Sequence, residues 1–130
     1  MLAGQQWFKI LIIDDSGSFV KGCQHLLNEI NDAAIVDEVA YAAEGLDLVS
    51  FCNPDFVILN IRLPDVGGIE VLKEIKKNCP ALHVAIFTNY PYPSYRTQCM
   101  ELGADYFFDK SAEILKAKKI LMKLVSETCQ

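Results

Sequence analysis

Residues 8–15 read FKILIIDD. The first six are apolar except for Lys9, and the acidic pair Asp14 and Asp15 ends the run. A short apolar run without alternation is typical of a strand that is buried on both faces of a sheet. This stretch therefore predicts a central strand with carboxylates at its carboxyl end.

The same unit of strand followed by helix recurs along the chain. Ser16 can cap a first helix, in which apolar residues recur at helical spacing as far as Ile30. We expect further strands over residues 35–41, 56–60, 84–88 and 106–108, and further helices over 42–52, through Ile69, Leu72 and Ile75, and over 94–102 and 111–126. Short apolar strands joined by helices form a parallel sheet with right-handed crossovers and covered faces. The predicted fold is an α/β, doubly wound sandwich of three layers.

Length, charge and hydropathy limit the classes of protein to which the chain can belong. Its 130 residues, 52% of them hydrophobic, suffice for one domain, which we expect to span residues 1–130 with its core at about 8–125 and no appended effector domain. A net charge of -5 argues against nucleic acid as a direct partner. No apolar stretch is long enough for a membrane span and the first residues lack signal-peptide features, so we expect a cytoplasmic protein without a membrane partner.

The cysteines are odd in number and lack CxxC spacing: Cys23, Cys52, Cys79, Cys99 and Cys129. Cys23 and Cys99 fall within apolar helical patterns. We therefore expect reduced thiols that are mostly structural.

Polar residues stand at the carboxyl ends of four predicted strands. Asp14 and Asp15 follow the first strand, Asn60 ends the third, Thr88 ends the fourth, and Lys110 lies two residues beyond the fifth. Functional groups of such sheets gather at this edge, near the point where the strand order reverses. We therefore expect two acids, an amide, a hydroxyl and an ammonium group to converge there.

Four motifs together resemble the receiver domain of two-component response regulators, of the CheY-like type. They are IDD at residues 13–15, ILNIRLPDVGG at 58–68, FTN at 87–89 and GADYFFDK at 103–110. The resemblance covers essentially the whole chain, from about Phe8 to Val125. It implies a flavodoxin-like (βα)5 fold with strand order 2-1-3-4-5. It also implies signalling through phosphoryl transfer to a carboxylate, which requires a divalent cation and donors for the phosphoryl oxygens.

The resemblance assigns a role to each residue at the strand ends. Asp15 would bind Mg²⁺ directly, Asp14 would act mainly through a metal-bound water, and Arg62 would contribute its backbone carbonyl. Thr88 would donate its hydroxyl to a phosphoryl oxygen. Lys110 would pair with the phosphoryl group and with the acid at the phosphoacceptor position.

Position 60 departs from the family pattern, because Asn60 stands where the phosphoacceptor aspartate is expected. An amide oxygen is a poor nucleophile and carries no charge, so formation of an acyl phosphate should fail. The site also loses one anionic ligand, so we expect Mg²⁺ binding to be weakened. Asn60 is either natural to a receiver that works without phosphorylation or a replacement that locks the domain unphosphorylated.

The resemblance also implies an output surface formed by the fourth helix, the fifth strand and the fifth helix. Phe107 matches the switch aromatic that moves together with the threonine hydroxyl, although simple core packing explains it equally well. Residues 89–95 read NYPYPSY and are a candidate docking surface, with a stiff surface loop as the alternative. The expected partner is a histidine kinase or a downstream signalling protein, and a homodimer through the same face is left open.

The sequence predicts a single-domain receiver that binds proteins and catalyses no turnover, so no residue is expected to be catalytic. One alternative is an ordinary phosphoacceptor receiver that was inactivated by substitution and natively relays phosphoryl groups from a histidine kinase. Another is a small flavodoxin-like protein that binds a ligand at the same strand ends. Asp14 and Asp15 disfavour an anionic ligand there unless a metal is present.

Overall fold

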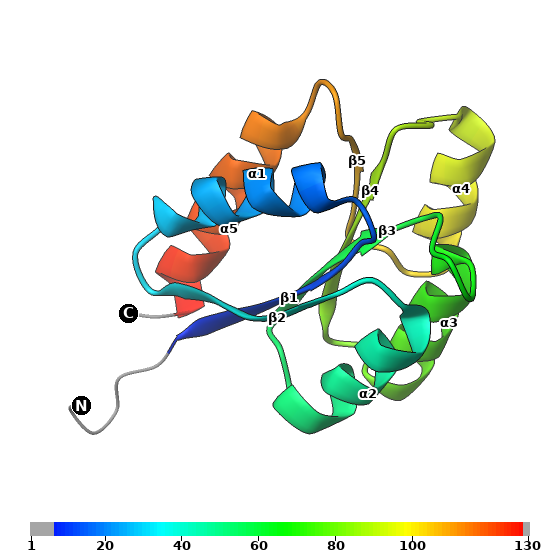
Figure 1. Ribbon diagram of the computed structural model, residues 1–130, viewed down its shortest axis with the longest axis horizontal. Coiled ribbons are helices and arrows are strands. Elements are labelled where there is room, and N and C mark those ends of the chain that lie inside the picture. The colour runs from blue at the N-terminus through cyan, green and yellow to red at the C-terminus, as the bar shows by residue number, and fades with distance from the viewer. Residues whose placement is uncertain (1–6, 129–130) are drawn as a thin grey trace.

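The computed structural model describes residues 7–128, in which five strands and five helices alternate along the chain (Figure 1). The strands are β1 (Phe8–Ile13), β2 (Ala33–Val39), β3 (Phe56–Asn60), β4 (His83–Thr88) and β5 (Tyr106–Asp109). The helices are α1 (Gly17–Asn28), α2 (Ala42–Cys52), α3 (Gly68–Asn78), α4 (Pro93–Glu101) and α5 (Ile114–Thr128). Neighbouring strands are parallel, in the order β2-β1-β3-β4-β5. The predicted doubly wound sandwich and its strand order are confirmed.

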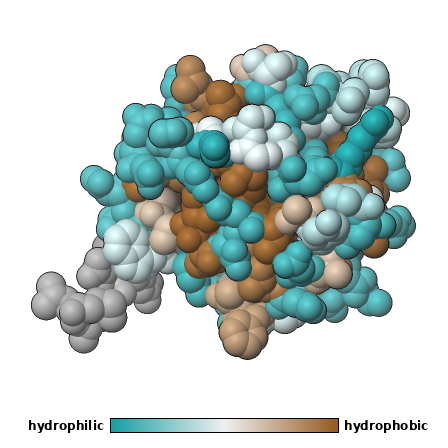
Figure 2. Space-filling model, in the orientation of Figure 1, coloured by the Kyte–Doolittle hydropathy of each residue, from teal (hydrophilic) through white to brown (hydrophobic). Residues whose placement is uncertain are grey.

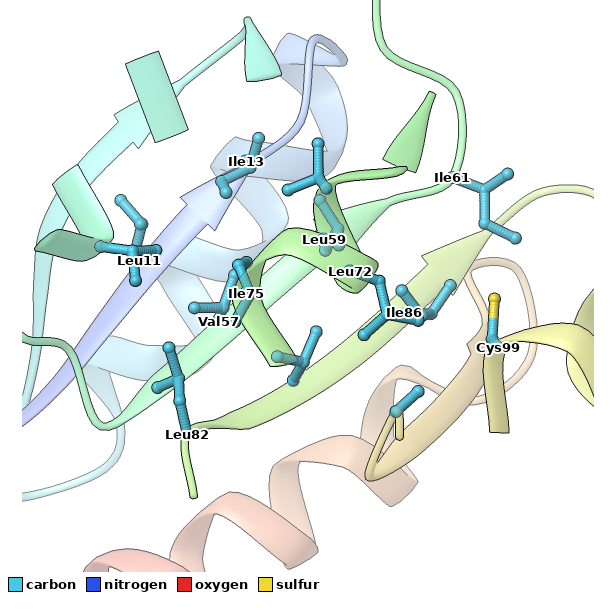
Figure 3. Packing of buried hydrophobic residues seen from close by; sticks show 14 of the residues in the cluster. Leu11, Ile13, Val57, Leu59, Ile61, Leu72, Ile75, Leu82, Ile86 and Cys99 are labelled. Atoms are coloured by element: carbon cyan, nitrogen blue, oxygen red, sulfur yellow. The ribbon is translucent and has the colours of Figure 1, made fainter. Parts of the chain in front are cut away.

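Two apolar layers fill the spaces on either side of the sheet. α1 and α5 cover one face, and α2, α3 and α4 cover the other (Figure 1). In β1, Ile10 and Ile12 pack in the first layer, whereas Leu11 and Ile13 pack in the second, where Figure 3 shows them on the face that α3 covers. All four are fully buried, and each such side chain contributes about 1.5–3 kcal/mol to folding. The run of residues 8–13 lacks alternation because both of its faces are buried.

The edge strand β2 departs from the prediction at both ends. It begins at Ala33 and ends at Val39, two residues earlier at each end than the predicted 35–41. Its partner sets these limits, because Phe8 pairs with Ala33 and Ile13 pairs with Val39. Tyr41, the predicted last residue of the strand, is instead the N-cap of α2.

The start of α5 also differs from the prediction, and a local turn explains the difference. The Asp109 carboxylate accepts hydrogen bonds from the Ser111 N–H at 2.9 Å and from the Ser111 hydroxyl at 2.8 Å. Asn and Asp side chains commonly hold a turn in this way, two residues ahead of themselves. The helix consequently begins at Ile114 and not at Ser111. β5 extends to Asp109, so Lys110 directly follows the strand.

Hydrophilic side chains cover most of the molecular surface seen in Figure 2. An apolar area occupies the middle of this view, where β2 lies in Figure 1. Residues of β2 are half-buried except for Asp37, which is exposed, as is usual for a strand at the edge of a sheet. Within residues 7–128, none of the helices combines the length and the apolar character that crossing a membrane requires.

The thiols that the structure describes are free, in agreement with the prediction. Cys23 is buried in the layer under α1 and α5, and Cys99 is buried in the layer under α4. Burial raises the pKa of Cys23 to about 12 and that of Cys99 to about 11. Both are therefore packing residues without thiolate character at neutral pH. Cys129 lies outside the described residues.

Candidate functional site

The candidate site lies at the carboxyl ends of β1, β3, β4 and β5, which end on the same side of the molecule (Figure 1). β1 lies between β2 and β3, so the order of strands reverses beside it, and functional groups of α/β sheets gather at such a point. Asn60 pairs with Phe87 across β3 and β4, and Thr88 pairs with Asp109 across β4 and β5. The strand ends are therefore nearly level, and the polar residues that follow them share one edge.

Asp14 and Lys110 form a buried ion pair between the loops that follow β1 and β5. Asp14 Oδ2 lies 2.8 Å from Lys110 Nζ, and neither side chain is more than 6% exposed. The Ser16 N–H donates to Asp14 Oδ1 at 2.9 Å, and Lys110 Nζ also lies 4.4 Å from the centre of the Phe19 ring. Burial raises the pKa of Asp14, and the hydrogen bonds from Lys110 and Ser16 oppose this effect. Lys110 is the charge that compensates the Asp14 carboxylate in its buried position.

Asn60 bridges two loops through its side-chain amide. Its Nδ2 donates to the backbone oxygen of Arg62 at 2.6 Å and to Oδ1 of Asp15 at 3.3 Å. Both acceptors are oxygens without hydrogens, so the amino group of the amide, and not its carbonyl oxygen, must face them. The amide thereby links the loop that follows β1 to the loop that follows β3.

These acceptor oxygens are the ones that the resemblance assigns to a metal ion. Mg²⁺ is held by carboxylate, carbonyl and water oxygens. Here the hydrogens of an amide face the Asp15 and Arg62 oxygens, while Oδ2 of Asp14 faces Lys110. Across the part of the chain that the structure describes, no group of three or more His, Cys, Asp or Glu residues could hold a metal ion. In this arrangement the residues disfavour a divalent cation, since the amide of Asn60 would have to turn before its Oδ1 could act as a ligand.

Thr88 and Tyr90 bring the loop that follows β4 to the site. Thr88 is 1% exposed, and its Oγ1 accepts a hydrogen bond from the Tyr90 N–H at 2.9 Å. The Arg62 guanidinium lies over the Tyr90 ring, with Cζ 4.1 Å from the ring centre, which is a cation–π distance. The Lys110 N–H donates to the Thr88 carbonyl at 2.9 Å. Backbone pairing therefore brings Thr88 and Lys110 together, and stacking on Tyr90 holds Arg62 beside the loop that follows β4.

The segment predicted as a docking surface, residues 89–95, forms a cluster of three aromatic rings at the start of α4. Tyr90 stacks with Tyr92 at 6.3 Å between ring centres, and Tyr92 meets Tyr95 edge-on at 5.5 Å. Tyr90 and Tyr92 are exposed. Sequence reasoning found the segment but missed the contact with Arg62, because residues 62 and 90 meet only through the fold.

Phe107 is buried in the layer beneath α4, as the core-packing interpretation of this residue requires. Arg96 of α4 lies against it, with Cζ 5.2 Å from the ring centre, and its guanidinium donates to the Phe107 carbonyl at 3.2 Å. Sequence reasoning did not single out Arg96. The only sequence feature that could have indicated Arg96 is a cationic residue in a helix with few apolar residues, and this feature is not specific.

The loop that follows β3 is fixed at both of its ends. The Gly68 N–H donates to the Ile61 carbonyl at 2.6 Å, which closes the loop. The Asp65 carboxylate accepts hydrogen bonds from the Ala42 N–H at 2.8 Å and the Ala43 N–H at 3.1 Å, and so caps the start of α2. These backbone hydrogen bonds, that of Ala42 first, lower the pKa of Asp65. The sequence analysis did not predict this capping role, because Asp65 caps a helix whose first residue, Ala42, lies 23 residues earlier in the chain.

Comparison with protein families gives a match over most of the chain. The model of the response regulator receiver domain matches residues 10–122. Sporulation initiation phosphotransferase F of Bacillus subtilis is 32% identical over 117 residues, which cover 88% of this chain and 91% of that protein. Protein-glutamate methylesterase/protein-glutamine glutaminase 4 of Hahella chejuensis is 29% identical over 126 residues.

The lengths of these relatives differ. The match covers 92% of this chain but 32% of the Hahella protein, and 49% of the response regulator GacA of Pseudomonas aeruginosa. The chain therefore spans a third to a half of the length of several curated relatives. Among solved structures, a two-component response regulator of the LuxR family from Aurantimonas sp. SI85-9A1 superposes with a TM-score of 0.84 at 25% identity, over 94% of this chain and 87% of that one.

Proposed function

Since this chain belongs to the family of response regulator receiver domains, we propose that it is a signalling module that binds partner proteins without accepting a phosphoryl group at position 60. The observation that supports the absence of phosphorylation is the amide of Asn60 at the end of β3. Around it lie Asp14, Asp15, Thr88 and Lys110. A receiver with these neighbours and a carboxylate at position 60 would have the groups that phosphoryl transfer requires.

The chemistry of the amide supports the absence of phosphorylation. A carboxylate attacks the phosphorus of a phosphodonor with a charged oxygen, whereas the amide oxygen is neutral and its lone pair is delocalised toward nitrogen. The amino group of Asn60 is engaged with Arg62 and Asp15, and this further fixes the orientation of the amide. We also infer weak Mg²⁺ binding, since receiver domains usually hold this ion with three acids nearby and this chain has two.

Partner binding, and not catalytic turnover, is the proposed activity. The candidate surface comprises α4, β5 and α5 together with residues 89–95. Tyr90, Tyr92, Met100 and Leu115 contribute exposed apolar area to these elements, and aromatic residues of this kind are enriched in protein interfaces. A histidine kinase or a downstream signalling protein in the cytoplasm is the proposed partner class. Enzymatic activities in the names of longer relatives belong to those proteins.

A phosphorylation assay tests the proposal. The native chain and the Asn60→Asp variant are incubated with Mg²⁺ and acetyl phosphate, and the intact mass of each is measured. We expect a phosphoryl adduct on the Asn60→Asp variant and none on the native chain. Asn31→Asp is a matched control, because it makes the same chemical change in an exposed residue ahead of β2.

The outcomes separate the alternatives. An adduct on the native chain, mapped by peptide mass to residues 58–68, would contradict the proposal. An adduct on Asn60→Asp alone means that Thr88, Lys110 and the acidic pair are competent and that position 60 silences them. If neither protein gains a phosphoryl group, the site has diverged more widely, and binding that is independent of phosphorylation is supported more strongly.

A further inference from the structure

The amide of Asn60 contacts both a carboxylate and a backbone carbonyl, each from a different loop. Nδ2 carries two hydrogens, and the acceptors at 2.6 Å and 3.3 Å are the Arg62 carbonyl and Asp15 Oδ1. One donor group thus joins two acceptor oxygens that belong to different loops. Both hydrogen bonds are exposed to solvent, so without the amide these two oxygens would depend on water or a cation for their partners, and neither of these is fixed in place by the chain.

We propose that the Asn60 amide takes the place of a divalent cation in this chain and keeps the site assembled when no metal is bound. The inference rests on the proposed function only in identifying position 60 as the phosphoacceptor position. The amino group has a partial positive charge and two directed hydrogens, so it joins the same two oxygens that a cation would join. Unlike an ion, the amide is part of the chain and does not have to be taken up from solution.

The charges around the site agree with this role. With an aspartate at position 60, three carboxylates would share the edge of the sheet with the single ammonium group of Lys110. Such a cluster is repulsive and gains from a bound cation. In the native chain, Lys110 is paired with Asp14, and the remaining carboxylate, Asp15, has the amide as its donor. Each acidic side chain therefore has a partner supplied by the chain itself.

Contacts within the chain also join the other loops of the site. Lys110 and Asp14 connect the loops after β5 and β1, and the Arg62 guanidinium over the Tyr90 ring connects the loops after β3 and β4. The Asn60 amide connects the loops after β1 and β3. All four loops are thereby linked in series without a metal. The amide joins the loops after β5 and β1, which are already paired, to the loops after β3 and β4.

Metal binding carries a specific penalty in such a site. For Asn60 to become a ligand, its amide must turn so that Oδ1 faces the cation, and both hydrogen bonds of Nδ2 are then lost. Each such bond contributes a factor of about two to ten to an equilibrium. We therefore expect Mg²⁺ to bind the native chain at least tenfold more weakly than it binds the Asn60→Asp variant, beyond any effect on phosphorylation.

Thermal unfolding with and without metal tests this inference. Melting temperatures are measured in EDTA and in millimolar Mg²⁺ for the native chain, Asn60→Asp and Asn60→Ala. We expect a much smaller rise with Mg²⁺ for the native chain than for Asn60→Asp, whose melting temperature should be low in EDTA and increase with Mg²⁺. Asn60→Ala removes the amide without adding charge, so we expect it to melt below the native chain under both conditions. Asn31→Asp controls for the added charge.

Two results would overturn the inference. One is a rise in the native melting temperature with Mg²⁺ that equals the rise for Asn60→Asp, and the other is an Asn60→Ala variant as stable as the native chain.

If a variant does not fold, NMR of the native chain decides instead. The Asn60 side-chain amide protons should exchange slowly with solvent and keep their shifts in Mg²⁺, and fast exchange or a Mg²⁺-dependent shift would contradict the role. Phosphorylation of the native chain would defeat the proposed function and leave these readouts intact.

Discussion

Gly68 is the residue on which the geometry of position 60 depends most directly. A Cβ at this position would lie 2.1 Å from the carbonyl oxygen of Asn60 and 2.8 Å from the Cα of Ile61. These are backbone atoms, so they cannot move aside as the end of a flexible side chain could. The glycine therefore allows the first turn of α3 to approach the end of β3, and the short loop between them holds Arg62 beside Asn60.

The Gly68→Ala substitution should destabilise the protein strongly. Because the new methyl group would collide with the β3 backbone, we expect a loss of about 2–4 kcal/mol in the free energy of unfolding. Urea denaturation followed by circular dichroism measures it. Gly22→Ala is a matched control in α1, where a Cβ would meet no atom within 4 Å, and there we expect a gain of up to about 1 kcal/mol. Equal stabilities of the two variants would show that the 61–68 loop is not closed as described.

Among the elements, α2 depends on a cap from a distant loop. Its own N-cap residue, Tyr41, makes no side-chain hydrogen bond to the helix. The Asp65 carboxylate supplies the missing acceptor, and its negative charge also complements the positive end of the helix. The loop after β3 and the helix after β2 are therefore stabilised together. This contact connects the site to α2, the helix that follows the edge strand β2.

The contribution of Asp65 should depend on pH. Its pKa is lowered in the folded state, chiefly by the hydrogen bond from the Ala42 N–H, so its contribution to stability is present above the unfolded pKa and is lost as the pH falls through the folded pKa. We expect Asp65→Ala to melt below the native chain at neutral pH. The difference should shrink below about pH 4, where the carboxyl is protonated in the unfolded state.

The comparison that checks this is a series of melting temperatures from neutral to acidic pH. Asp47→Ala serves as the control, because Asp47 is an exposed acid of α2 without a hydrogen bond to the helix start. A difference between Asp65→Ala and the native chain that stays constant down to acidic pH would mean that the charged carboxylate is not the cap.

Element boundaries show what the sequence could and could not predict. β1, α2 and β3 begin and end where the apolar pattern predicted, because burial on both faces or the adjoining proline and polar residues mark their limits. β2 was misplaced by two residues because its ends are set by pairing with β1, and α5 was started early because the turn at Asp109 was not recognised. The cap from Asp65 could not be predicted, since it joins segments that are distant in the sequence.

At the scale of the whole molecule, the candidate site was predicted as a set of residues but not as a set of contacts. The strand order and the placement of Asp14, Asp15, Asn60, Thr88 and Lys110 at one edge follow from local patterns and the topology of parallel sheets. Which carboxylate pairs with Lys110, and which way the amide faces, depend on side-chain conformations that no sequence pattern encodes. The roles in metal and phosphoryl binding stay predictions.

The helices differ in how many buried residues attach them to the sheet, and α4 has the fewest. α1 places Cys23 and Leu27 in its layer, and α5 adds three further buried residues. Cys99 is the one buried side chain of α4 within the described residues; Tyr95 is half-buried against the same layer, and Arg96 contacts Phe107 of β5. Local opening starts where few apolar contacts are made. We therefore expect α4 to open more readily than the rest of the molecule.

Thiol labelling can measure this difference, because each layer contains a buried cysteine. In the native chain, Cys99 should react faster than Cys23, and Arg96→Ala should accelerate Cys99 about tenfold, since a charged hydrogen bond and a cation–π contact are both lost. Cys23 should keep its rate, because its layer does not involve Arg96. Peptide mass after timed quenching reports the two rates, with Gln98→Ala, an exposed residue of α4, as the control. Equal acceleration of both cysteines would show that the sheet and all its helices open as one unit.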